Sequence, residues 1–193
     1  MSCRDALSLT RADAAWWAGR PGDCIDVLER AYTAYVPTGN RARAGYVALS
    51  LARECAGRLA HTVASGWLKR ATRPLEAEPE GAEHAYLYAR RSALALSAGD
   101  LDEAIELAQK SISLGEGLGD RNVEALGLVN KGMALVEKGQ LSEGLALIDE
   151  AAVAAVSGFV GPLWLTSSLR SLTCLARSSD KSTGVCRCGR ATW

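Results

Sequence analysis

One helix-forming phrase recurs along this chain at an interval of 40 residues. It is clearest at residues 99–114, GDLDEAIELAQKSISL, where a glycine and an aspartate precede an amphipathic helix. It returns at residues 139–156 and, more loosely, at residues 19–35. The small residue near the centre of each copy falls at Ala31, Ala71, Ser111 and Ala151. This spacing predicts repeated helical hairpins, each of which buries its apolar face against its neighbours.

The first two hairpins have recognisable turn and capping residues. A helix over about residues 5–19 is followed by a Pro-Gly turn, after which Asp23 is expected to cap a helix that ends at Tyr35. Asn40 is expected to cap the next helix, over residues 41–56. A partner helix should end at about residue 73, because Pro74 follows it.

The third and fourth hairpins are the most regular. A helix is expected over residues 82–98, and Asp100 then caps a helix over 101–114. Helices over 120–138 and 141–156 form the last pair. The connector before the third hairpin, PLEAEPEGAE at residues 74–83, is acidic and is interpreted as a solvated loop. We therefore expect an all-α superhelix of about four hairpins over residues 1–158.

The last 35 residues, 159–193, do not continue this pattern. One further helix is predicted over about residues 163–177, where it could cap the open end of the array, and residues 178–193 have no helical period. Two explanations stay open for this basic, Ser-, Arg- and Cys-rich tail. It is either read out of frame after a frameshift, or it is a genuine divergent C-terminus.

Charge and hydropathy narrow the expected partners. Residues 1–158 hold 17 basic and 21 acidic side chains, a net −4, whereas residues 159–193 hold five basic and one acidic, a net +4. An acidic repeat body gives no electrostatic basis for binding nucleic acid. No segment resembles a signal peptide or is apolar enough to span a bilayer. Six cysteines are then best interpreted as reduced thiols of a cytoplasmic protein.

The repeated phrase GDLDEA resembles the turn of the tetratricopeptide family. The glycine of that family's turn matches Gly19, Gly99 and Gly139, and its small residue matches Cys24, Ala64, Ala104 and Gly144. More closely, residues 14–158 resemble the tetratricopeptide region of large actinobacterial regulators of the LuxR type. The phrases that carry this are AAWWAGRPGDCIDVLERAYTAY, AGDLDEAIELAQKSISLGEGLGD and GMALVEKGQLSEGLALIDEA. The resemblance implies a role in transcriptional regulation beside a separate DNA-binding domain.

No arrangement of residues predicts catalysis, a metal or a cofactor. His61 and His84 lie in different hairpins, and Cys186 and Cys188 lack a second pair of ligands. The glycines of the segment GEGLG, residues 115–119, follow a helix rather than a strand, so they predict a helix end and turn instead of a phosphate-binding loop.

The resemblance also implies a concave groove lined by the first helix of each hairpin. Carried over by position, its candidate residues are Leu9, Asp13, Trp16, Tyr46, Leu49, Arg53, Tyr86, Ala89, Ala93, Leu126, Val129 and Met133. Tyr46 and Tyr86 would stack on an extended peptide, and Arg53 would bind a carboxylate. The alternative is that these side chains only pack the helices together.

Two functions follow from these expectations. The chain is either a non-enzymatic interaction module from a multidomain transcriptional regulator, without its DNA-binding domain, or a standalone peptide-binding adaptor. In both cases the partner is a protein or peptide. An array with a bare end also exposes apolar surface, so we expect marginal stability or self-association.

Overall fold

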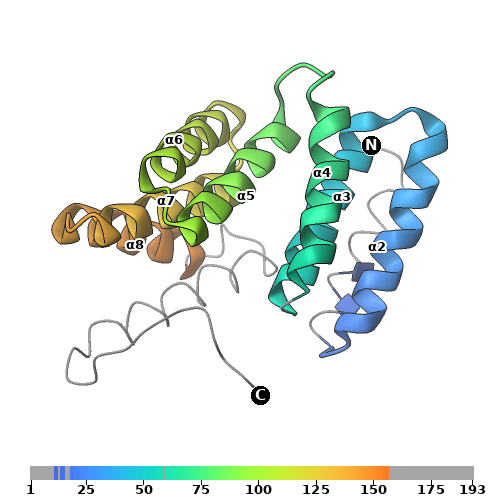
Figure 1. Ribbon diagram of the computed structural model, residues 1–193, viewed down its shortest axis with the longest axis horizontal. Coiled ribbons are helices and arrows are strands. Elements are labelled where there is room, and N and C mark those ends of the chain that lie inside the picture. The colour runs from blue at the N-terminus through green and yellow to red at the C-terminus, as the bar shows by residue number, and fades with distance from the viewer. Residues whose placement is uncertain (1–10, 13, 16–17, 59, 157–193) are drawn as a thin grey trace.

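The computed structural model describes residues 11–12, 14–15, 18–58 and 60–156. These residues form α-helices joined by short turns, and no strand occurs among them. The fold is an all-α helical repeat superhelix (Figure 1). The tail prediction for residues 159–193, including its capping helix, falls outside the described residues.

Within each hairpin the two helices are antiparallel neighbours (Figure 1). Residues 11–12 and 14–15 are helical and precede the first labelled helix. In order, the elements are α2 (Pro21–Tyr35), the 3-10 turn η1 (Val36–Thr38), α3 (Arg41–Gly57), α4 (His61–Leu75), α5 (Ala82–Ala98), α6 (Leu101–Leu118), α7 (Arg121–Glu137) and α8 (Leu141–Val156). Helices α3 with α4, α5 with α6, and α7 with α8 form the three complete hairpins of the described chain.

Two of the predicted caps, Asn40 and Asp100, are confirmed, and Asp120 caps a third helix. The side chains of Asn40, Asp100 and Asp120 each accept a hydrogen bond from a backbone N–H in the first turn of α3, α6 and α7. Each bond satisfies an amide that the helix itself leaves without a partner. Glycines in the left-handed conformation occupy the turns at Gly19, Gly39, Gly99, Gly119 and Gly139.

The predicted cap of α2 is wrong. The helix begins at Pro21, its N-cap is Arg20, and no side chain caps it. Proline suits the first helical position, because its φ angle is already helical and its missing N–H would have no partner there. Asp23 therefore lies inside the first turn, where its carboxylate pairs with the Arg20 guanidinium at 3.2 Å.

Two other helix ends were predicted too early. Helix α4 continues through Pro74 to Leu75, whose fully buried side chain packs over Gly45 of α3. Helix α6 continues to Leu118, so only the third glycine of the 115–119 segment forms the predicted helix end. Gly115 is helical, and a Cβ there would lie 2.9 Å from the Glu124 backbone nitrogen, so it lets α6 approach α7 closely.

The 40-residue period corresponds to buried small residues where helices cross. Its four positions, Ala31, Ala71, Ser111 and Ala151, are all buried. The four residues that match the small position of the tetratricopeptide family, Cys24, Ala64, Ala104 and Gly144, are buried as well. The repeat read from the sequence is therefore a repeat of close helix packing.

The junction between the second and third hairpins differs from the next one. Helix α6 packs closely on α7, whereas contact between the second and third hairpins runs mainly from α3 to α5. The connector of residues 76–81 separates α4 from α5 (Figure 1). The exposed side of α4 is consequently left without the neighbour that α6 has.

Candidate functional site

The predicted groove residues that the structure describes lie on α3, α5 and α7, which together form one face, here called the first-helix face. Tyr46 of α3 and Tyr86 of α5 contact each other edge to face, with ring centroids 5.4 Å apart and an interplanar angle of 85°. Tyr86 is buried and Tyr46 half-buried. The two rings therefore pack edge to face against each other across the junction between hairpins.

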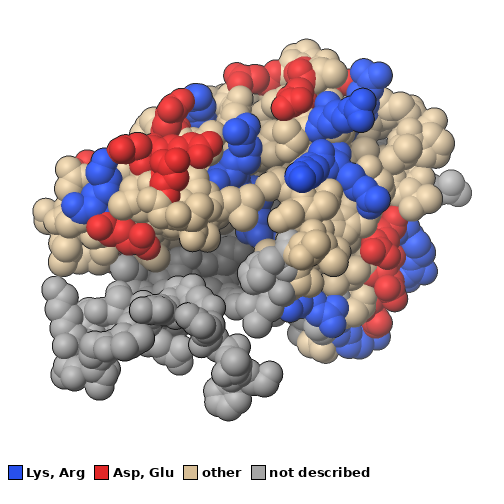
Figure 2. All heavy atoms as spheres, viewed as in Figure 1, with Lys and Arg blue, Asp and Glu red and all other residues tan. Residues whose placement is uncertain are grey.

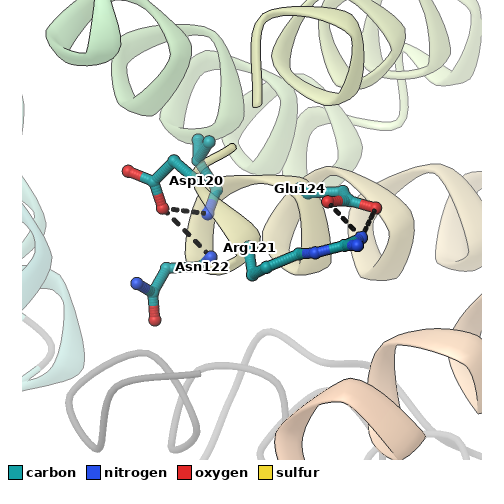
Figure 3. A network of polar contacts seen from close by, with 5 residues as sticks. Asp120, Arg121, Asn122 and Glu124 are labelled. Carbon is teal, nitrogen blue, oxygen red and sulfur yellow. Dashed lines mark hydrogen bonds and ion pairs between the residues drawn. The ribbon is translucent and has the colours of Figure 1, made fainter. Parts of the chain in front are cut away.

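Tyr86 also connects α5 to the start of α7. Its hydroxyl donates to both carboxylate oxygens of Asp120, at 3.2 and 3.0 Å. The same carboxylate accepts from the backbone N–H groups of Asn122 and Val123, while Arg121 pairs with Glu124 at 3.0 Å (Figure 3). Burial, followed by the neighbouring Tyr46 and Asp120, raises the pKa of Tyr86.

Arg53, which was predicted to bind a carboxylate of a peptide, belongs to a charge cluster with Glu54 and Arg90. Its Nε and Nη2 both donate to Glu54 Oε1, at 3.1 and 2.6 Å. Arg90 of α5 lies close enough to interact with both charges. Burial lowers the pKa of Arg90, Arg53 lowers it further, and Glu54 raises it.

The remaining predicted groove residues contribute little polar chemistry. Leu49, Ala89, Leu126 and Val129 are buried, and Ala93 and Met133 are half-buried. The Ala89 carbonyl accepts a 2.8 Å hydrogen bond from the Asn130 side chain, which ties α7 to α5. Leu9, Asp13 and Trp16 lie outside the described residues.

Arg90 is the residue of this face that the sequence interpretation missed. No hydrogen bond or ion pair joins its guanidinium to another described residue. Its position four residues after Tyr86 places it on the same side of α5, which is the signal that could have identified it. Arg53, Glu54 and Arg90 therefore form a group of charged side chains where α3 meets α5.

Neither a metal site nor a membrane span is found in the described part of the chain. No group of three or more His, Cys, Asp or Glu side chains there could hold a metal ion. No described helix is both long and apolar enough to cross a bilayer.

Comparison with known proteins identifies a structural neighbour. The chain is similar to the crystal structure of BtubC (BKLC) from P. vanneervenii, with a TM-score of 0.56 and 16% sequence identity over 98% of this chain and 69% of the other. At that identity the likeness shows the fold alone. No protein-family model and no curated protein matches the chain.

Proposed function

We propose that this protein is a helical repeat module that binds a peptide segment of a partner protein, and that it acts without catalysis, metal or cofactor. The observation that carries the proposal is Arg90, which lies beside Arg53 and Glu54 on the first-helix face. Burial lowers the pKa of Arg90, and no hydrogen bond or ion pair joins its guanidinium to another described residue, so its positive charge lies in a poorly solvated place. A carboxylate from a partner would compensate it and accept charge-assisted hydrogen bonds.

The proposal extends to the biological setting. The resemblance of the repeats to the tetratricopeptide region of LuxR-type regulators supports a regulatory module that has a DNA-binding domain elsewhere in its protein. The acidic body, net −4 over residues 1–158, supports a protein partner instead of direct contact with nucleic acid or membrane. We place the module in the cytoplasm, where buried thiols such as Cys55 stay reduced.

A binding experiment tests the role of Arg90. A labelled library of short peptides with free carboxyl ends is compared with the same library amidated, using fluorescence polarisation. We expect Arg90→Gln to weaken binding of the free-carboxylate peptides about tenfold or more, because a hydrogen bond to a charged group contributes about 1.5–3 kcal/mol. Equal binding by the Arg90→Gln variant would refute this site.

The chain offers a matched control next to Arg90. Arg91 is the following residue of α5, exposed, and 3.9 Å from the Glu103 carboxylate. Arg91→Gln changes the same charge on the same helix but away from the Arg53–Glu54 pair. We expect it to leave peptide affinity unchanged.

The second candidate function is a standalone adaptor, and the gene sequence separates it from the regulator. The nucleotide sequence downstream of codon 145 is translated in all three frames. Helical hairpins that resume in a shifted frame and lead to a helix-turn-helix would support the regulator. A chain that ends with no such continuation would support the adaptor.

A further inference from the structure

A hollow of about 820 Å³ lies away from the first-helix face, at the end of the molecule where α2 and α4 finish. Its walls come from the last turns of α2 and α4, the first turn of α3 and the loop between α2 and α3. Among the residues that line it are Tyr32, Tyr35 and Ala44 and the cations Lys69, Arg70 and Arg73. Its size is within the range of sites that hold small ligands or side chains.

The floor of the hollow is apolar, and aromatic packing and local hydrogen bonds fix its shape. Tyr32 contacts Trp67 edge to face, with centroids 5.1 Å apart, and Tyr35 and Ala44 are buried. The loop at its rim is fixed by local bonds, since the Thr38 hydroxyl donates to the Tyr35 carbonyl at 2.7 Å. A preformed site loses little conformational entropy when a ligand binds.

The rim is strongly basic. Arg41, Lys69, Arg70 and Arg73 line the hollow, and no carboxylate is among its described lining residues. Glu78 partly neutralises Arg41, at 3.7 Å, whereas Lys69, Arg70 and Arg73 form no ion pair with a described carboxylate. Figure 2 shows lysine and arginine side chains gathered over the part of the surface where α4 lies.

A second, shallower hollow of about 490 Å³ lies on the other side of α4. Its apolar lining includes Leu68, Leu94 and Ala98 from α4 and α5. Lys69 and Arg73 line both hollows, so they form a basic ridge between two apolar depressions. This arrangement exists because α4 and α6 are not packed together as α6 and α7 are.

We propose that these two hollows bind an acidic peptide segment that places an apolar side chain in each depression and carboxylates over Lys69 and Arg73. Charge complementarity favours this occupant, because Lys69 and Arg73 lie between the two apolar floors and bidentate arginine pairs suit carboxylates. A nucleic acid would need a continuous basic track. Beyond α4 such a track would meet Glu76 and Glu103, which line the second hollow.

The width of α4 sets the spacing of the ligand. A helix with its side chains is about 10–12 Å across. An extended peptide covers about 3.3 Å per residue, so about three residues cross the ridge. The segment therefore has two apolar residues about three to four positions apart in the sequence, and the positions between them are acidic.

Fluorescence polarisation with a labelled probe tests the proposal on the full chain. The probe is a peptide with two phenylalanines separated by three glutamates and one glutamate at each end. We expect saturable binding that weakens at least tenfold in the Lys69→Glu/Arg73→Glu variant. Lys69→Gln/Arg73→Gln should weaken it less, and this second variant adds no carboxylates to the last turns of α4. Ala77→Trp, at an exposed position of the rim, should block the larger hollow without changing the core.

Matched controls separate this site from general charge effects. Arg30→Glu/Lys110→Glu makes the same change in net charge at exposed positions outside both hollows, and should change affinity by no more than about twofold at physiological salt.

Three results would overturn the proposal. Equal binding by Lys69→Gln/Arg73→Gln would show that the basic ridge is not used. Equal binding of a probe with glutamine in place of glutamate, or alanine in place of phenylalanine, would show that the ligand chemistry is wrong. If a single-stranded oligonucleotide binds through Lys69 and Arg73 as tightly as the peptide probe does, the ligand of this surface is a nucleic acid and not an acidic peptide.

Discussion

The imidazole of His84 joins α5 to the last turn of α4, because its Nε2 lies 2.8 Å from the backbone oxygen of Leu75. Its Nδ1 accepts a 3.2 Å hydrogen bond from the Gly81 N–H, so Nε2 is the nitrogen that donates to Leu75. One buried side chain thus holds both ends of the connector between the second and third hairpins. It satisfies a terminal carbonyl of α4 and a terminal amide of α5.

His84→Ala should destabilise the protein by about 2 kcal/mol, because it removes both bonds and leaves the Leu75 carbonyl without its partner. Urea unfolding followed by circular dichroism measures the loss. His84→Gln is the matched variant, since glutamine at this helix position can still accept from the Gly81 N–H but does not reproduce the ring. We expect an intermediate loss. A change under about 0.5 kcal/mol in His84→Ala would contradict the role assigned to the ring.

Gly132 and Gly144 let α7 and α8 approach through their backbones. A Cβ at Gly132 would lie 2.6 Å from the Gly144 carbonyl oxygen and 2.8 Å from Ile148 Cγ1. Gly132→Ala should therefore destabilise the fold by about 1–3 kcal/mol through overpacking. Gly66→Ala is the control, because a Cβ at this position of α4 would contact nothing within 4 Å.

The two alanine variants should move the melting temperature in opposite directions. Gly66→Ala should raise stability by about 0.5–1 kcal/mol, since alanine restricts the unfolded chain more than glycine does. Thermal unfolding at constant protein concentration reports both changes. A neutral Gly132→Ala would mean that the helices can separate at little cost.

The sequence predicted the features that depend on near neighbours. The caps at Asn40 and Asp100 bond to amides three residues away, so their pattern is visible in the chain itself. The start of α2 was missed because two local preferences compete there, and proline at the first helical position prevails over Asp23 as a cap.

The sites themselves depend on contacts that no local pattern contains. Tyr86 and Asp120 bond across 34 positions of the sequence, and the basic hollow joins α2, α3 and α4. Arg53 lies on α3, and its pairing with Glu54 and its proximity to Arg90 follow from how α3 meets α5. Predicting such contacts requires the angle between hairpins, which a repeat period does not determine.

Glu54→Gln should cost about 3 kcal/mol, because the buried Glu54 carboxylate accepts two hydrogen bonds from Arg53 and interacts favourably with Arg90. Asp23→Asn is the surface control. It breaks the Arg20–Asp23 pair, in which both side chains are more than half exposed, at 66% and 55%, and should cost under about 1 kcal/mol. Urea unfolding at 0.1 and 1 M salt distinguishes them, since added salt should abolish only the surface effect. Equal losses in the two variants would contradict a buried charge cluster.

Tyr86 should make the fold sensitive to alkaline pH. Burial raises the pKa of its hydroxyl above the ordinary value of about 10, so the folded chain keeps this proton after the unfolded chain has lost it. The stability that this difference contributes is complete below about pH 10 and is lost as the pH rises further, at up to about 1.4 kcal/mol per pH unit. Tyr86→Phe should lower stability by about 1–2 kcal/mol at pH 8, where the bond to Asp120 is intact.

Above pH 10 the difference between wild type and Tyr86→Phe should shrink, because only the wild type loses stability through this group. Urea unfolding at pH 8, 10 and 11 measures it. Tyr88→Phe is the comparison, since Tyr88 bonds to Glu80 at 2.6 Å near the surface and the pKa of its hydroxyl is raised mainly by that bond. Water can replace that contact, so the Tyr88 effect should be smaller at every pH. A constant difference between wild type and Tyr86→Phe from pH 8 to 11 would show that Tyr86 ionises as readily in the folded chain as in the unfolded one.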